Sequence, residues 1–355
     1  MNLDLLIAEL VAGKTAALAR AISVVENTRP GFERLLGEVH RSLGRARRIG
    51  VTGPPGAGKS TLVERLVSHY RSNNLKVAVV AVDPTSPFTG GALLGDRIRM
   101  ESIALDQGVY IRSMATRGSL GGLATTTREV CDVFDAAGFD RILVETVGVG
   151  QSELDVAKMA DTTVLVLVPE SGDGIQTLKS GVMEIADVFV VNKADRPGGD
   201  KLRQEIEITL GIRRGNAFRN VPAHHGERGS GTAGERTSSR MGLRKSEQPT
   251  ASGAWEPPVI LTSAVKSEGI PEFGSVLDRH HGWLVESGEL EQRRRRRLRE
   301  RTREVVDRAT RRWVWEETRA EQLIEERLDE VTGGQVSPYQ LAQDVLEELK
   351  QGEKI

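Results

Sequence analysis

Eight residues from Gly53 to Ser60 combine three glycines with a lysine and a serine in the pattern G-x-x-x-x-G-K-S. Glycines in such a loop let backbone N–H groups turn inward around phosphates, and the following helix N-terminus adds a positive dipole. We expect Lys59 to reach the β- and γ-phosphates of a nucleoside triphosphate and the Ser60 hydroxyl to ligate Mg²⁺.

The flanks of this loop favour the phosphate-binding interpretation over a glycine-rich turn that binds nothing. An apolar, β-branched run before it predicts a strand, and Leu62, Val63 and Leu66 after it predict a helix. The residues predicted to contact the nucleotide here are Gly53, Pro54, Pro55, Gly56, Ala57, Gly58, Lys59, Ser60 and Thr61.

Acidic residues near the ends of predicted strands are the next candidates. Asp83 closes one strand and Asp96 follows a glycine-rich stretch, although Asp is also an ordinary turn former. Glu145 stands three residues before Gly148, so the Gly148 N–H would sense the γ-phosphate while the acid organises water on the metal. We predict Lys59, Asp96, Glu145 and Gly148 as catalytic residues and Ser60, Asp83, Asp96 and Glu145 as the Mg²⁺ site.

Two later motifs indicate which base is bound. Asn192-Lys193-Ala194-Asp195 fits N-K-x-D, whose aspartate accepts the guanine N1–H and 2-amino protons, a pattern that adenine cannot supply. The run Thr262-Ser263-Ala264 resembles an element whose backbone N–H meets the guanine O6. The predicted nucleotide is therefore GTP or GDP, bound here by Asn192, Lys193, Asp195, Ser263, Ala264 and Val265.

The order of patterns predicts an α/β fold, a P-loop NTPase of the G-domain type with a mostly parallel central sheet and helical extensions at both ends. Expected strands are 48–52, 76–83, 109–113, 141–147, 162–168, 187–192 and 258–262. We predict a helical extension over 1–46, a G domain over 47–285 and a helical dimerisation region over 286–355.

Three segments have open interpretations. The stretch 114–123 is either a switch ordered by the γ-phosphate or a plain loop. Residues 170–187 are polar and glycine-broken, as in a strand-to-helix connection. Residues 213–253, with eight Arg or Lys against three Glu, predict a disordered surface insertion, and we expect His224 and His225 to be solvated rather than metal ligands.

The C-terminal part predicts a long amphipathic helical pattern from Glu289 to Val331 and a last helix over 337–349. Its basic run Arg293–Arg297 is flanked by acids, which favours a solvated helix face over a nucleic-acid patch. Trp313 and Trp315 suggest a packed interface, with the G domain or with a second subunit.

The composition describes an ordinary globular chain of 355 residues with a net charge of −1. Balanced charge argues against a general affinity for nucleic acid, and the N-terminus lacks the pattern of a signal or transit peptide. Absence of a long apolar stretch argues against a membrane span, so we expect a cytoplasmic location. The single cysteine, Cys131, lies in an apolar pattern and is expected to be a core residue.

With these motifs in place, the chain resembles the MeaB/ArgK family, the methylmalonyl-CoA mutase-associated GTPases. The resemblance is close over about 15–210 and looser over 255–345. The segments that carry it are ARAISVVEN (19–27), VTGPPGAGKSTL (51–62), AVDPTSP (81–87), GDRIRM (95–100), ETVGVGQSE (145–153) and QTLKSGVME (176–184). The insertion 213–253 is longer and more polar than the family pattern.

The resemblance implies a homodimeric GTPase that dimerises through its C-terminal helices and uses Lys59, Ser60, Asp83, Asp96 and Glu145 around the phosphates and Mg²⁺. It also implies that 170–187 is a third switch, which reports the nucleotide state to an adenosylcobalamin-dependent acyl-CoA mutase. Such proteins couple GTP hydrolysis to loading of the mutase and release of damaged cofactor.

Hydrolysis in such a site is positioning and charge stabilisation. Because Gln151, rather than a residue next to Gly148, is the nearest glutamine, we expect slow turnover that a partner accelerates. The main alternative is a nickel-delivery GTPase for hydrogenase or urease, which would need more metal ligands than Cys131. A kinase acting on a transport protein and a nucleic-acid-binding module rank lower.

Overall fold

The computed structural model describes residues 2–84, 100–116, 122–146, 152–169, 182–213 and 253–351. The chain divides into two compact units, Met1–Leu290 and Glu291–Ile355. The first unit contains three clusters of buried apolar residues and the second a small one around Ala320, Leu341 and Val345.

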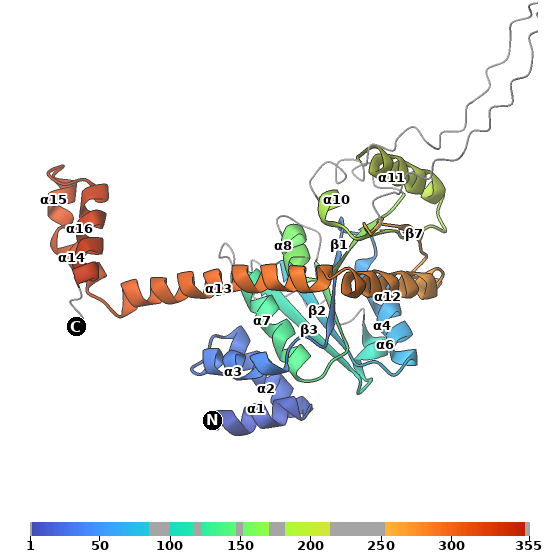
Figure 1. The fold of residues 1–355 in the computed structure, drawn as a ribbon, viewed down its shortest axis with the longest axis horizontal. Helices are drawn as coiled ribbons and strands as arrows, with labels where there is room; N and C mark the ends of the chain where they lie inside the picture. Colours follow the sequence, from blue (N-terminus) through green and yellow to red (C-terminus); the bar gives the residue numbers. More distant parts are fainter. Residues whose placement is uncertain are drawn as a thin grey trace, which may run out of the picture. The chain divides into compact units, whose positions relative to one another are not determined.

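A seven-stranded sheet forms the centre of the first unit (Figure 1), with the strand order β3-β2-β4-β1-β5-β6-β7 and every pair parallel. This confirms the predicted fold class. The strands are β1 (Arg47–Thr52), β2 (Val77–Pro84), β3 (Val109–Thr116), β4 (Arg141–Thr146), β5 (Thr162–Leu167), β6 (Val188–Val191) and β7 (Val259–Leu261).

Helices cover both faces of this sheet, which is why most residues of its strands are apolar. Side chains alternate between the faces, so Val79 packs toward the helix after the P-loop, whereas Val80 packs toward the N-terminal helices. The helices that follow the first strand are α4 (Lys59–Ser72), α6 (Glu101–Ala104), α7 (Gly122–Ala136), α8 (Ser152–Met159), α10 (Val182–Ile185), α11 (Gly199–Arg213) and α12 (Ile270–Glu286).

The N-terminal extension consists of α1 (Leu3–Val11), α2 (Thr15–Glu26), α3 (Phe32–Val39) and the short 3-10 helix η1 (His40–Ser42). The Asn2 side chain caps α1 by accepting from the Leu5 N–H at 3.1 Å. Apolar residues of all three helices, among them Leu10, Ile22 and Leu35, join one core with α7 (Figure 1). The predicted amphipathic helices are present, and α7 supports them.

The second unit and its approach contain α13 (Glu289–Glu316), α14 (Ala320–Glu326), α15 (Leu328–Thr332) and α16 (Pro338–Gln351). The prediction of a continuous helical pattern from Glu289 to Val331 is wrong, because α13 ends at Glu316 and α14 begins only at Ala320. There the Thr318 hydroxyl donates to the Val314 carbonyl and accepts from the Ala320 N–H, so it bonds to the backbone on both sides of the break.

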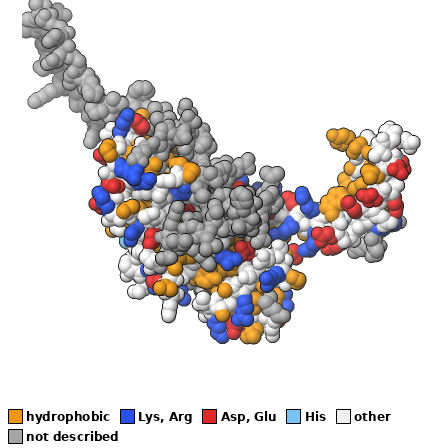
Figure 2. Space-filling model, turned by 180° about the vertical axis from the view of Figure 1, so that it is seen from behind, with side chains coloured by type: hydrophobic (Ala, Val, Ile, Leu, Met, Phe, Trp, Pro, Cys, Tyr) orange, Lys and Arg blue, Asp and Glu red, His pale blue; other side chains and the backbone are white. Residues whose placement is uncertain are grey.

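Trp313 and Trp315 are exposed within this unit, at 40% and 48%. Contacts within the described second unit therefore do not form the predicted packed interface. On the face drawn in Figure 2, basic and acidic side chains are interspersed over the described surface. No helix among the described residues is long and apolar enough to span a bilayer.

Cys131 lies fully buried on α7, and burial raises the pKa of its thiol to about 12. We predict that the native protein does not react with a thiol reagent such as DTNB at pH 8, where the thiolate fraction is minute. One equivalent should react after unfolding in urea. Fast stoichiometric reaction of the native protein would show that α7 is not packed as described.

Candidate functional site

The predicted phosphate loop joins β1 to α4 and presses closely against two neighbouring strand ends. Gly53 has φ 140° and Gly58 has φ 80°, both in the region that favours glycine. A Cβ at Gly53 would lie 2.1 Å from the Val166 carbonyl oxygen of β5, and one at Gly58 would lie 2.6 Å from Asn192 Nδ2. These glycines are therefore required by space as well as by backbone conformation.

Lys59, the first residue of α4, directs its ammonium back into this loop. Lys59 Nζ donates to the carbonyl oxygens of Gly53 at 2.8 Å and Pro54 at 3.0 Å, and the residue is buried. The cation is thus held at the concave side of the loop, where the backbone and the α4 N-terminus already favour an anion.

The adjacent Ser60 faces an acid from the neighbouring strand. Ser60 Oγ donates to Glu145 Oε1 at 2.6 Å, and Glu145 is buried opposite Val51 in the β1–β4 register. One residue further along each strand, the Thr146 hydroxyl donates to the Thr52 hydroxyl at 3.1 Å. The carboxyl end of β4 is therefore fixed to the start of the phosphate loop.

Asn192, directly after β6, connects three loops through one buried amide. Its Nδ2 donates to the Ala57 carbonyl at 2.8 Å, in the phosphate loop. Its Oδ1 accepts from the Thr262 hydroxyl and from the Ala264 N–H, both at 3.1 Å, after β7. A single side chain thus sets the distance between the phosphate end and the base end of the candidate site.

Asp195 lies at the base end and is held by Ser263. Asp195 Oδ1 accepts from the Ser263 hydroxyl at 2.8 Å, while Lys266 Nζ lies 3.9 Å from Oδ2. The hydrogen bond from Ser263 lowers the pKa of the Asp195 carboxyl below its usual value. The group therefore remains an acceptor over the physiological pH range, as recognition of guanine N–H groups requires.

The structure describes only some of the remaining predicted residues. Asp83 lies in the last part of β2, beside β4, so the backbone brings it to the same edge as Thr146, but its side chain is outside the described part. Asp96 and Gly148 lie outside the described residues, as do 170–181 and 214–252, including His224 and His225. Lys193 has a left-handed φ of 56° and Val265 is exposed.

Two contacts were not predicted from the sequence. Arg65 of α4 donates from Nε to the Ala264 carbonyl at 3.3 Å, so the element after β7 is held from the phosphate-loop helix as well. The Thr262 hydroxyl donates to Asn192, and the sequence signal for this contact is the position of Thr262 as first residue of the motif Thr262-Ser263-Ala264. Among the described residues, no group of three or more His, Cys, Asp or Glu is arranged to hold a metal ion.

This geometry can be compared with known proteins. A family model described as methylmalonyl-CoA mutase-associated GTPase MeaB matches residues 18–319, which include every strand and the four motifs above. The chain belongs to the MeaB family. The predicted family resemblance is thereby confirmed, and the fold and family together make this chain a GTPase that binds a guanine nucleotide.

Relatives of this MeaB-family chain come from archaea, bacteria and mammals. It is 41% identical to a Pyrococcus abyssi protein over 347 residues, 98% of this chain and 97% of the relative. It is 36% identical to GTPase ArgK of Escherichia coli, with 84% and 83% covered. It is 37% identical to the mouse mitochondrial methylmalonic aciduria type A homolog, with 82% of this chain and 66% of the relative covered.

A solved structure described as a LAO/AO transport system kinase shares the fold of this MeaB-family chain. The two have 27% identity and a TM-score of 0.62, with 98% of this chain and 97% of the other covered. The matched region therefore includes residues of both units of the chain.

A glycine substitution tests the close approach of Asn192 to the phosphate loop. We predict that Gly58→Ala lowers GDP affinity at least about 10-fold, because the new Cβ displaces Asn192 and adds strain of about 1 kcal/mol at positive φ. The matched control is Gly138→Ala, which has φ 83° and open space around the added Cβ.

Both variants carry the same backbone strain, so both should lose a similar amount of thermal stability from that source. Isothermal titration with GDP should find normal affinity in Gly138→Ala. Equal GDP affinity in the two variants would contradict the described contact.

Proposed function

We propose that this GTPase assembles, protects and reactivates an adenosylcobalamin-dependent acyl-CoA mutase of the methylmalonyl-CoA mutase type, coupling GTP hydrolysis to loading or release of the cofactor. The observation that carries the proposal is the match of the mutase-associated family over residues 18–319. The named mouse relative, a methylmalonic aciduria type A homolog, supports it.

For hydrolysis, we assign the phosphate contacts to the loop Gly53–Ser60. Lys59 stabilises charge on the β- and γ-phosphates, and we assign the Gly148 N–H as a hydrogen-bond donor to the γ-phosphate. Glu145 organises the water bound to the metal, Asp96 is a further catalytic residue of the proposal, and water attacks in line. Ala264, Val265, Ser263 and Asp195 hold the guanine base.

The donors at the phosphate end fit a magnesium ion, because Ser60 Oγ and Glu145 Oε1 are hard oxygen ligands 2.6 Å apart beside the loop. Ser60 and Glu145 would hold the ion together with Asp83 and Asp96. When bound, Mg²⁺ neutralises negative charge on the phosphates. The residues of the chain then need only orient the phosphates and the water.

The C-terminal helices are the proposed dimer interface. Apolar side chains that the described second unit leaves exposed include Trp313, Trp315, Leu328, Tyr339 and Leu346. Aromatic residues of this kind are enriched in interfaces between subunits. A second copy of the chain is the proposed occupant of this surface.

The direct test is GTP turnover by the purified protein, alone and with its host's adenosylcobalamin-dependent acyl-CoA mutase. We expect slow turnover alone, at least about a 10-fold rise with the mutase, and no activity on ATP. Lys59→Ala should abolish the stimulated rate, since the lysine stabilises charge that develops on the phosphates.

Turnover that no mutase alters would contradict the proposed partner while leaving the GTPase intact. A rate changed by nickel instead would favour the metal-delivery alternative.

Base recognition gives a separate prediction. Asp195→Asn replaces a double acceptor by one acceptor and one donor, which mismatches the guanine 2-amino group but suits the C2 carbonyl of xanthine. We expect GDP affinity to fall roughly 100-fold and affinity for xanthosine diphosphate to rise. Fluorescent-nucleotide titration would measure both, with Asp200→Asn on α11 as a control. Unchanged GDP binding in Asp195→Asn would remove Asp195 from the base site.

A further inference from the structure

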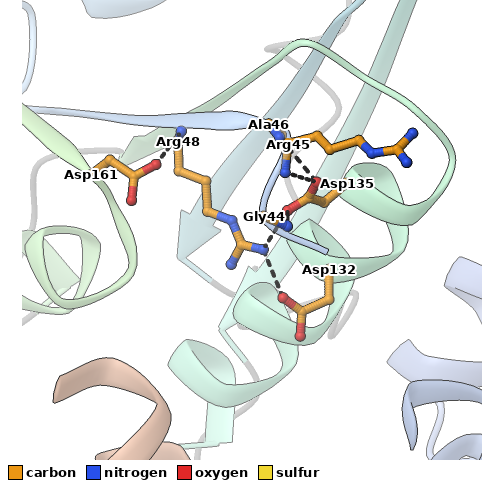
Figure 3. Close-up of polar contacts among 7 residues, drawn as sticks. All are labelled: Gly44, Arg45, Ala46, Arg48, Asp132, Asp135 and Asp161. Atoms are coloured by element: carbon orange, nitrogen blue, oxygen red, sulfur yellow. Dashed lines mark hydrogen bonds and ion pairs between the residues drawn. The ribbon is translucent and has the colours of Figure 1, made fainter. Parts of the chain in front are cut away.

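A buried ionic cluster surrounds Arg48, on the opposite side of β1 from α4 (Figure 3). Arg48 Nη2 lies 2.7 Å from Asp132 Oδ1 and 3.4 Å from Asp135 Oδ2, both on α7. The Arg48 N–H donates to Asp161 Oδ2 at 3.1 Å, and the Asp161 N–H donates to the Arg48 carbonyl at 2.8 Å. Arg48 therefore joins α7 to the turn between α8 and β5.

The cluster is set within the interior. The side chains of Arg48, Asp132 and Asp135 are 12%, 3% and 2% exposed. Burial alone would lower the pKa of Arg48, but the Asp132 carboxylate raises it above its usual value. Since a buried charge is tolerated only with its partners in place, α7 is restricted to one position against β1.

Asp135 extends the cluster to the N-terminal extension. Its carboxylate accepts from three successive N–H groups, those of Gly44 at 2.9 Å, Arg45 at 3.1 Å and Ala46 at 3.0 Å (Figure 3). These residues connect η1 to β1. The same helix, α7, packs against α2 and α3 in the apolar core, so a displacement of α7 carries the whole extension with it.

The next residue of β1 on this face is Gly50, which α8 approaches closely. A Cβ there would lie 2.4 Å from Val156 Cγ1 and 3.1 Å from Ala160 Cβ, so α8 packs directly on the strand backbone. Thr52, two residues further, binds Thr146 at the end of β4. One face of β1 thus contacts α7, α8 and the end of β4 in sequence.

Chain connectivity links these contacts to the phosphate end. Helix α7 begins at Gly122, shortly after β3, and α8 begins at Ser152, four residues after Gly148. Each helix therefore begins just beyond a carboxyl end of the sheet, where ligands of parallel α/β folds bind. Only three residues, 149–151, separate Gly148 from the first residue of α8.

We propose that Arg48, with Asp132, Asp135 and Asp161, couples the phosphate end of the GTPase site to helices α1–α3, so that the N-terminal extension responds to the bound nucleotide. Arg48 is a positioning residue in this account, because it lies near the amino end of β1, five residues before the phosphate loop begins at Gly53. The response is a property of the chain alone and requires no partner.

Hydrogen exchange on the wild-type protein is the first test. The amides of Gly44, Arg45 and Ala46 should exchange at least 5-fold differently with GDP than with a non-hydrolysable GTP analogue bound. Equal exchange in both states would overturn the proposal without any variant.

A matched pair of substitutions is the second test. Arg48→Lys keeps the charge but cannot span both carboxylates, and it should abolish the exchange difference and lower kcat for GTP about 10-fold at unchanged KM. Arg47→Lys, on the neighbouring residue that pairs with Asp278 at 2.6 Å, should alter neither. Should Arg48→Lys not fold, Asp132→Asn replaces it in the same comparison.

A variant of the cluster that keeps the nucleotide-dependent exchange difference and the wild-type kcat would contradict the proposal. So would a loss of kcat in Arg47→Lys equal to that in Arg48→Lys, since the effect would then not belong to the cluster.

Discussion

The buried amide of Asn192 is the interaction on which the described nucleotide site depends. It bonds at once to the phosphate loop, to the Thr262 hydroxyl and to the Ala264 N–H, in loops that are more than 60 residues apart in the sequence. A buried polar group that loses its partner costs about 1–3 kcal/mol, so the three loops must be arranged together. Gly58 is glycine because this amide occupies the space of its Cβ.

The two faces of strand β1 contact different parts of the first unit. Ile49 and Val51 pack with α4 and α12 and so support the helix that carries Lys59 and Ser60. Arg48, Gly50 and Thr52 contact the helices and strand end that follow the phosphate site. The P-loop leaves the sheet where the strand order reverses, between β4 and β5, which is the place where open α/β sheets bind ligands.

Much of this arrangement is readable from the sequence because it is local. Apolar, β-branched runs predict the seven strands to within a few residues, and glycine spacing with Lys59 and Ser60 predicts the loop. The partners of Asn192 and Arg48 are not readable, since they depend on which strands become neighbours. An arginine at the start of a strand gives no sign of two buried carboxylates that lie 84 and 87 residues later.

In the C-terminal region, the local pattern itself predicts the wrong helix boundaries. Its charged, amphipathic pattern continues past Thr318, so periodicity alone predicts one helix where the structure has several. At the break, the Thr318 hydroxyl bonds to the backbone on both sides, a contact that hydrophobic periodicity does not register.

The most direct measurement of the central claim is a calorimetric titration of the wild-type protein and Asn192→Ala with GDP and with ADP. Because Asp195 accepts the guanine N–H groups, the wild type should bind GDP at least about 100-fold more tightly than ADP, and this preference requires Asn192 to hold the base loops against the phosphate loop. The Asn192→Ala variant should lose most of that preference while remaining folded. Equal affinity of the wild type for GDP and ADP, or an unchanged preference in Asn192→Ala, would contradict the account.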